Sequence, residues 1–215
     1  MKSHHVIAVL AAAALISACA NPGSDPRSCC AWTITVLGDS SDPRYGAVVE
    51  AAHFWNQQFA VLGMPLRLTP VTTDAHRVAQ LTLSQLSATI VGRGRALPPA
   101  ELRQIPGDLI VAFAESPDFT SFGIAPERFG GRGFVALRPG HLLPLSAPNV
   151  ARNVAAHEIG HALGLRHNTT PGTLMCMPPA PCRPLSFRAD TVLFFPLTGV
   201  EKQELVQRWH GRRPR

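Results

Sequence analysis

The residues best suited to chemistry lie close together in the stretch HEIGHALGLRH, which begins at His157. Because residues four apart share one face of an α-helix, His157 and His161 would present two imidazole rings to the same metal ion. Glu158 would lie about 100° further round the helix, where its carboxylate can reach a water molecule on that ion. Gly164 would end the helix in a left-handed conformation, and the turned chain would bring back His167 as a third ligand.

This pattern predicts a catalytic metal site. Three neutral imidazoles and a vacant fourth position form the open tetrahedral ligand set of catalytic zinc, so we expect a Zn²⁺ cofactor. A structural zinc site would normally fill four protein ligands and favour thiolates, which this stretch does not supply. The remaining alternative, a charged helix with incidental histidines, leaves the regular spacing without a cause.

The chain continues past the third histidine as Thr173-Leu174-Met175, and in this it resembles the metzincin metalloproteases. The signature of that family is H-E-x-x-H-x-x-G-x-x-H followed by a Met-turn. The resemblance implies that Met175 packs beneath the zinc ligands, with Met177 as a rival for the same place. Several branches of the family carry a tyrosine two residues after the Met-turn methionine, where this chain has Met177. Stabilisation of the oxyanion would then depend on arginine, on backbone donors or on zinc itself.

The residues and the resemblance together predict a zinc-dependent endopeptidase. Zinc bound by His157, His161 and His167 would lower the pKa of a water molecule and polarise the scissile carbonyl. Glu158 would be the general base that takes the proton from this water and returns it to the leaving amine. The expected partner is a peptide or protein substrate. Two alternatives stay open: a catalytically silent zinc- or peptide-binding lipoprotein of the envelope, and a metallohydrolase that cuts a non-protein amide.

Hydrophobic periodicity and turn residues predict the elements that must position this site. In chain order they are a strand at 32–38, a helix at 43–62, an edge strand at 66–72, strands at 108–113 and 133–138, a central helix from 149 to 164, and a closing helix at 198–209. Asn149 is the expected N-cap of the central helix. Thr198 and Glu201 fit a capping box for the closing helix.

The order of elements resembles matrix-metalloproteinase-type catalytic domains, so the predicted fold class is α+β, a metzincin-like zincin fold. We expect a mixed twisted sheet with two long helices in an N-terminal catalytic lobe at 31–167. A small irregular lobe at 168–215 would contain the Met-turn and end in the closing helix. In that family an antiparallel edge strand binds the substrate backbone, and here it would come from 119–138. The wall of the S1′ pocket would come from 174–186.

The composition is that of a packed globular domain. Hydrophobic residues make up 46% of the 215 residues and charged residues 16%, which excludes a disordered chain or a coiled coil. The formal net charge of +6 comes from basic residues scattered along the sequence, so we expect a solvated basic surface and no nucleic-acid partner. No apolar run approaches the ~20 residues of a membrane-spanning helix. We expect a monomer.

Residues 1–18 have the pattern of an export signal, with Lys2 followed by a short apolar run. The run ends in LISAC, which resembles the bacterial lipobox, where the signal is cut before a cysteine that becomes lipidated. The mature chain would then begin at Cys19, and residues 19–30 would form a flexible tether. More than one acyl chain gives stable attachment, so the expected location is the bacterial cell envelope, exported and lipid-anchored to a membrane. A buried N-terminal helix is the alternative.

Four further cysteines predict disulfides, because an exported chain meets oxidising conditions. Adjacent cysteines seldom bond each other, so we favour Cys29 and Cys30 each bonded to one of Cys176 and Cys182. A local Cys176–Cys182 bond is the competing pairing, and free thiols are the third possibility.

We expect Cys19→Ser to release the protein from membranes, because serine cannot carry the thioether-linked lipid of a lipoprotein. The measurement is the fraction of protein that sediments with membranes after cell fractionation, with Ser24→Ala in the same tether as the control. Unchanged sedimentation of the Cys19→Ser chain would contradict lipidation.

Overall fold

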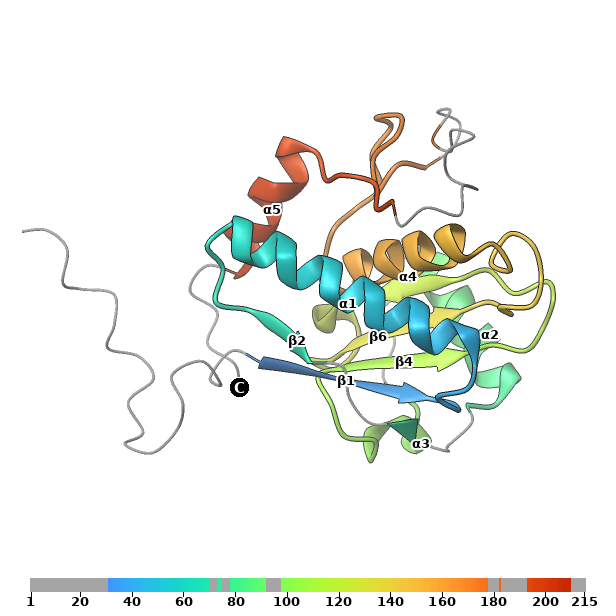
Figure 1. Ribbon diagram of the computed structural model, residues 1–215. Coiled ribbons are helices and arrows are strands. Elements are labelled where there is room, and N and C mark those ends of the chain that lie inside the picture. The colour runs from blue at the N-terminus through green and yellow to red at the C-terminus, as the bar shows by residue number, and fades with distance from the viewer. Residues whose placement is uncertain are drawn as a thin grey trace, which may run out of the picture.

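The computed structural model describes residues 31–69, 73–74, 78–91, 98–177, 182 and 193–209. Within these ranges the fold is α+β, as predicted (Figure 1). Neighbouring strands of the mixed sheet follow the order β2 (Arg67–Thr69), β1 (Ala31–Leu37), β4 (Leu109–Phe113), β6 (Gly133–Leu137) and β5 (Phe122–Ile124). A short strand, β3 (Thr73–Asp74), also pairs with β1. The strands pair in parallel except β5, which runs antiparallel to β6 at an edge of the sheet.

The sheet is covered on both faces, which explains why its central strands are continuous apolar runs. Every residue of β6 is buried, as are the first four residues of β4. One face carries α1 (Pro43–Val61) and α4 (Pro148–Ala162), which lie side by side above the strands in Figure 1. The other face packs against α2 (Gln80–Val91), α3 (Ala100–Arg103) and Phe129, which directly follows the 3₁₀ turn η1 (Pro126–Arg128). The chain closes with α5 (Gly199–Trp209).

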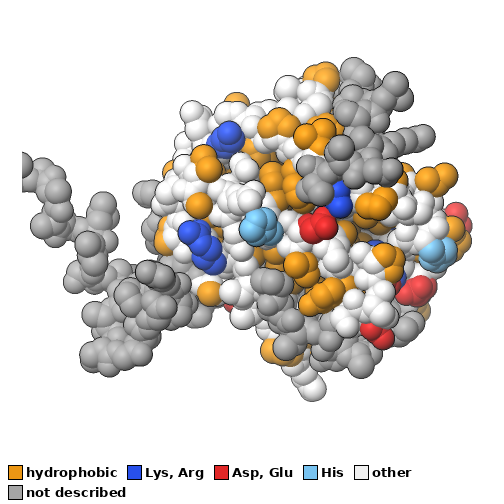
Figure 2. Space-filling view, in the orientation of Figure 1, with side chains coloured by type: hydrophobic (Ala, Val, Ile, Leu, Met, Phe, Trp, Pro, Cys, Tyr) orange, Lys and Arg blue, Asp and Glu red, His pale blue; other side chains and the backbone are white. Residues whose placement is uncertain are grey.

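Basic side chains are dispersed on the face of the molecule that Figure 2 shows. In the space-filling view, the described Lys and Arg side chains are scattered among uncharged and hydrophobic ones rather than gathered in one patch (Figure 2). Among the helices of the described ranges, none combines the length and the apolar character needed to cross a membrane.

Helix α1 begins as its sequence predicts and then holds α4 in place. The Asp42 side chain accepts a hydrogen bond from the main-chain N–H of Arg44, and Pro43 occupies the first turn. Further along, the fully buried Trp55 donates its indole N–H to the main-chain carbonyl of Ala156 at 3.0 Å. This bond ties the middle of α1 to the residue directly before His157.

Helix α4 begins two residues earlier than expected. Its N-cap is Ala147 rather than Asn149, because Pro148 already occupies the first turn, where its missing N–H costs nothing. The Asn149 Oδ1 atom instead accepts a hydrogen bond from the N–H of Leu193 at 3.0 Å. Asn153 likewise accepts from the N–H of Phe195 at 3.0 Å. Polar groups on a buried helix therefore anchor the segment that leads into α5.

The edge strand predicted within 119–138 is β5, and it lies directly on α4 through Gly123. A Cβ atom at Gly123 would lie 2.1 Å from the carbonyl oxygen of Glu158 and 2.8 Å from the Cβ atom of His161. Because the first of these neighbours is a backbone atom within a helix, it has little freedom to move away. Only glycine permits this approach of strand and helix.

The structure corrects the favoured disulfide pairing. Cys176 bonds Cys182, with a Cα–Cα distance of 5.4 Å, so neither can bond Cys29 or Cys30. The two cysteines are six residues apart, so the entropic cost of closing the loop between them is small. A bond to the start of the domain would close a much longer loop, at a larger entropic cost. Cys29 and Cys30 lie outside the described residues, as do the predicted signal, Cys19 and the tether.

We expect Gly123→Ala to lower the free energy of unfolding by about 3 kcal/mol or more, because its methyl group would force β5 away from α4. The measurement is urea unfolding. The matched control is Gly46→Ala within α1, where an added Cβ meets no atom within 4 Å. That control should gain roughly 0.5–1 kcal/mol from helix propensity. Equal stability of the two variants would contradict the close packing of β5 on α4.

Candidate metal centre

Helix α4 and the turn after it bring three imidazole rings together. His157 and His161 lie one helical turn apart on α4, whose C-cap is Leu163. Gly164 follows with a φ of +97°, a conformation that costs glycine little, and the chain reverses. His167 then returns so that its Nε2 atom lies 2.9 Å from Nε2 of His161 and 3.2 Å from Nε2 of His157.

The spacing of these nitrogens fits a zinc ion. Two nitrogens that each lie ~2.1 Å from a tetrahedral zinc are about 3.4 Å apart. The two separations recorded here are close to that value, and the three ligand atoms all lie within 4.8 Å of one another. Among the histidine, cysteine, aspartate and glutamate side chains of the described residues, these three histidines are the ones placed closely enough to hold a metal ion. The cluster therefore fits the predicted ion in ligand type and number, and two of its three nitrogen separations lie within about 0.5 Å of the tetrahedral value.

Backbone carbonyls set the orientation of two of the rings. Nδ1 of His157 lies 2.7 Å from the carbonyl oxygen of Leu174, and Nδ1 of His161 lies 2.9 Å from that of Leu165. A carbonyl oxygen can only accept, so each Nδ1 carries the proton and donates it. Each Nε2 then keeps its lone pair toward the point where the rings converge, which is the tautomer that a metal ligand needs.

Burial keeps His161 in its ligating form. Desolvation of the ring lowers the pKa of His161 to about 4. The hydrogen bond to the Leu165 carbonyl opposes this shift, and the neighbouring His167 adds to it. Because only the neutral imidazole binds a metal ion, few protons compete for this ring near neutral pH.

Met175 occupies the space beneath the ligand helix. Its side chain is fully buried, whereas that of Met177 is 47% exposed. A Cβ atom at Gly160 would lie 2.7 Å from the Sδ atom of Met175 and 3.2 Å from Cζ2 of Trp55. The second variable position of the H-E-x-x-H motif is thus a glycine that leaves room for the methionine. Of the two candidates from the sequence, Met175 is the one that lies under the helix.

Glu158 is buried beside the first ligand, with 7% of the residue exposed. Its position on α4, directly after His157, is the one that the motif predicts. Its carbonyl oxygen is the atom against which Gly123 of β5 packs. The edge strand and the predicted general base are therefore neighbours in space.

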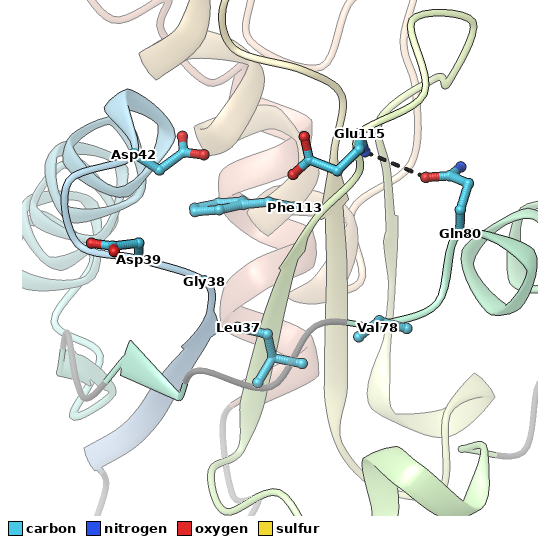
Figure 3. A pocket seen from close by; sticks show the side chains of 8 residues that line it. All are labelled: Leu37, Gly38, Asp39, Asp42, Val78, Gln80, Phe113 and Glu115. Carbon is cyan, nitrogen blue, oxygen red and sulfur yellow. Dashed lines mark hydrogen bonds between the residues drawn. The ribbon is translucent and has the colours of Figure 1, made fainter.

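A separate pocket lies at the carboxyl ends of β1 and β4, and none of the three histidines lines it (Figure 3). Asp39, Asp42 and Glu115 give it an acidic rim. The buried Arg44 binds both carboxylate oxygens of Asp42, at 2.9 and 2.6 Å, and lies 4.4 Å from the centre of the Phe113 ring. Arg44 thus neutralises part of this rim and fastens the start of α1 to the sheet.

Residues that sequence reasoning missed are those whose partners are distant in the chain. Gly123 and Gly160 carry no local signal for the contacts that they permit. Asn168 follows the third histidine, and its side-chain amide donates a hydrogen bond to the carboxylate of Glu201 on α5. The sequence pattern that involves Glu201 is the predicted capping box with Thr198, and it does not point to Asn168. The structure confirms this capping box: Thr198 N–H donates to Oε2 of Glu201 at 2.6 Å, and Glu201 N–H donates to Oγ1 of Thr198 at 3.2 Å.

Comparison with protein families gives one match, to the matrixin model of the M10 peptidases, over residues 95–188. The matched segment contains the three histidines and the Met-turn. It supports a zinc metallopeptidase of the metzincin type. Among solved structures, the chain is similar to archaemetzincin from Methanopyrus kandleri, with 17% identity, a TM-score of 0.44 and coverage of 83% of this chain and 94% of that one. No curated protein sequence matches the chain.

We expect His161 of the zinc-free protein to titrate near pH 4, because burial disfavours its charged form. Its folded pKa lies below the unfolded value of 6.5, so the unfolded chain binds more protons between these two values. Stability should therefore fall as the pH is lowered through this window, by about 3 kcal/mol in total.

The protonation of the His161 ring is measured by NMR of its Cε1–H group as the pH is changed. The free energy of unfolding is measured by urea unfolding at pH values from 7 to 4. His161→Gln assigns the resonance and serves as the control, because its unfolding should depend less steeply on pH. A midpoint close to 6.5 in the folded protein would contradict the expected desolvation.

Proposed function

We propose that this protein is a zinc-dependent endopeptidase in which His157, His161 and His167 hold the ion. The observation that carries the proposal is the convergence of three Nε2 atoms, two of which, on His157 and His161, have their lone pairs directed inward by Nδ1–carbonyl hydrogen bonds. These rings would hold zinc, which would supply a Lewis acid for the scissile carbonyl and for the attacking water. The matrixin match over 95–188 supports the same class of enzyme.

Glu158 is the proposed general base. Its carboxylate takes a proton from the attacking water and then returns the proton to the nitrogen of the leaving amine. Burial beside His157 excludes bulk water from this carboxylate and so strengthens its interactions with the reacting groups. Met175 is proposed to support the ligand helix from below, where Gly160 makes room for it.

The substrate is proposed to bind as an added strand along β5. This strand lies at an edge of the sheet, and edge strands present unpaired backbone groups to which an extended peptide can bond. Gly123 places the middle of β5 against the carbonyl of Glu158. An extended peptide on this edge would therefore lie next to the residue that must act on it.

We propose that the protein works as an exported monomer, anchored by lipid on Cys19 in the cell envelope and without a nucleic-acid partner. The sequence LISAC at the end of the apolar N-terminal run supports lipidation. The Cys176–Cys182 disulfide supports an oxidising compartment, because such bonds rarely persist in the cytosol.

We expect Glu158→Gln to bind zinc as the parent does and to lose peptidase activity by roughly 10²–10⁴-fold, because the amide cannot accept the proton. Zinc content is measured by metal analysis, and activity by digestion of a broad peptide library. Glu204→Gln on α5 is the matched control and should remain fully active. A chelator should abolish cleavage by the parent, and added zinc should restore it.

Activity of Glu158→Gln equal to that of the parent would contradict the role of this carboxylate. Zinc binding without any peptide cleavage by the parent would favour a silent binding protein. Cleavage of an envelope amide that is not a peptide bond between standard residues would favour the broader metallohydrolase.

A further inference from the structure

The third ligand is held differently from the other two. His157 and His161 stand on a long buried helix, and a carbonyl fixes each ring. His167 is exposed and lies beyond the Gly164 turn, outside any helix. The contacts that fix the main chain from Gly164 to Asn168 therefore contribute to the place of its imidazole.

Asn168 fixes the end of that segment through both its main chain and its side chain. Its N–H donates to the carbonyl of Met175 at 3.0 Å, and its carbonyl accepts from the N–H of Met177 at 3.0 Å. Its Oδ1 atom accepts from the N–H of Thr170 at 2.7 Å and from the hydroxyl of Thr173 at 3.1 Å. These bonds connect the residue after the third ligand to both ends of the Met-turn loop.

The remaining donor of Asn168 reaches the closing helix. Nδ2 donates to Oε1 of Glu201, a residue that is only 3% exposed. The other oxygen of the same carboxylate accepts from the N–H of Thr198 as part of the capping box. The capping carboxylate of α5 is therefore shared between the start of the helix and the residue next to His167.

The far end of α5 contacts the beginning of the same turn. The Trp209 indole N–H donates to the carbonyl of Leu163 at 3.1 Å. The Arg208 guanidinium lies over Gly164, where an added Cβ atom would be 2.2 Å from its Cζ atom, and it pairs with Glu127. Both ends of α5 thus hold the turn that carries His167.

We propose that Asn168 and Glu201 are positioning residues for the third metal ligand, and that α5 is the clamp through which they act. The proposal rests on the three-histidine metal site of the proposed function, but it does not depend on peptide hydrolysis. Outer-shell hydrogen bonds of this kind orient the ligands, and their loss typically weakens metal affinity by about 10–100-fold.

The hydrogen bond between the Asn168 amide and the Glu201 carboxylate can be tested by exchanging the two groups, so that the amide stands at 201 and the carboxylate at 168. Asn168→Asp places one carboxylate against another, while its oxygen can still accept from Thr170 and Thr173. In Glu201→Gln, the new amide nitrogen must face either the Thr198 N–H or the Asn168 amide. Both of these groups are donors, so one hydrogen bond is lost. In the double variant the new amide donates to the new carboxylate, and its oxygen still accepts from Thr198.

The experiment measures zinc affinity by competition with a chelator, and the visible spectrum of the Co²⁺-loaded protein as a report on the ligand set. Each single variant should bind zinc about 10–100-fold more weakly than the parent and show an altered Co²⁺ spectrum. The double variant should return to within about threefold of the parent, with the parental spectrum.

Thr198→Ala is the matched control, because it removes the hydroxyl of the capping box and leaves Asn168 and Glu201 unchanged. It should lower the unfolding temperature while zinc affinity stays at the parental value. Parental zinc affinity in both single variants would overturn the proposal. So would a double variant as weak as the product of the two single losses, or an equal loss of affinity in Thr198→Ala. Tight zinc binding by a parent that cleaves no peptide would overturn the proposed function alone.

Discussion

The whole site depends on the convergence of three imidazole nitrogens on one point. Two of them come together through the geometry of a single helix, because His157 and His161 are one turn apart. The third requires a reversal of the chain at Gly164. The positive φ of this residue would strain the backbone of any residue that carries a side chain. Everything else around α4 either keeps this helix still or keeps His167 within reach of it.

The ligand helix is fixed from three sides by contacts that leave little room. On one side Trp55 donates to the carbonyl of Ala156. From below, Met175 fills the space that Gly160 leaves, and from the edge of the sheet β5 approaches through Gly123. A site held by packed elements of this kind is preorganised, which is the condition for placing catalytic groups accurately. The two glycines therefore matter for the side chains that they allow to approach.

The chain after α4 completes the three-histidine cluster as well as the hydrophobic core. The carbonyl of Leu174 orients the ring of His157, and Asn168 connects the chain at His167 to the Met-turn and to α5. The Cys176–Cys182 disulfide closes a short loop directly after Met175. The segments before and after Gly164 thus both contribute to the three-histidine cluster, and the later segment does so mainly through hydrogen bonds that involve the main chain.

What the sequence by itself determined is what depends on short separations along the chain. The paired histidines follow from the helical repeat, the buried strands β4 and β6 from continuous apolar runs, and the capping box of α5 from Thr198 and Glu201 three residues apart. These patterns were sufficient to predict the α+β fold and the three-histidine cluster. The expected cap at Asn149 was wrong for a local reason, since Pro148 already occupies the first turn.

Only the tertiary structure decided the contacts between distant segments. The disulfide partner of Cys176 depends on which thiol is near in space, and adjacency rules along the sequence pointed to the wrong one. Gly123 and Asn168 look like ordinary loop residues until β5 and α5 are placed against the site. The physical reason is that steric fit and hydrogen-bond partners are properties of the packed chain, and residue type alone does not encode which distant atoms will be neighbours.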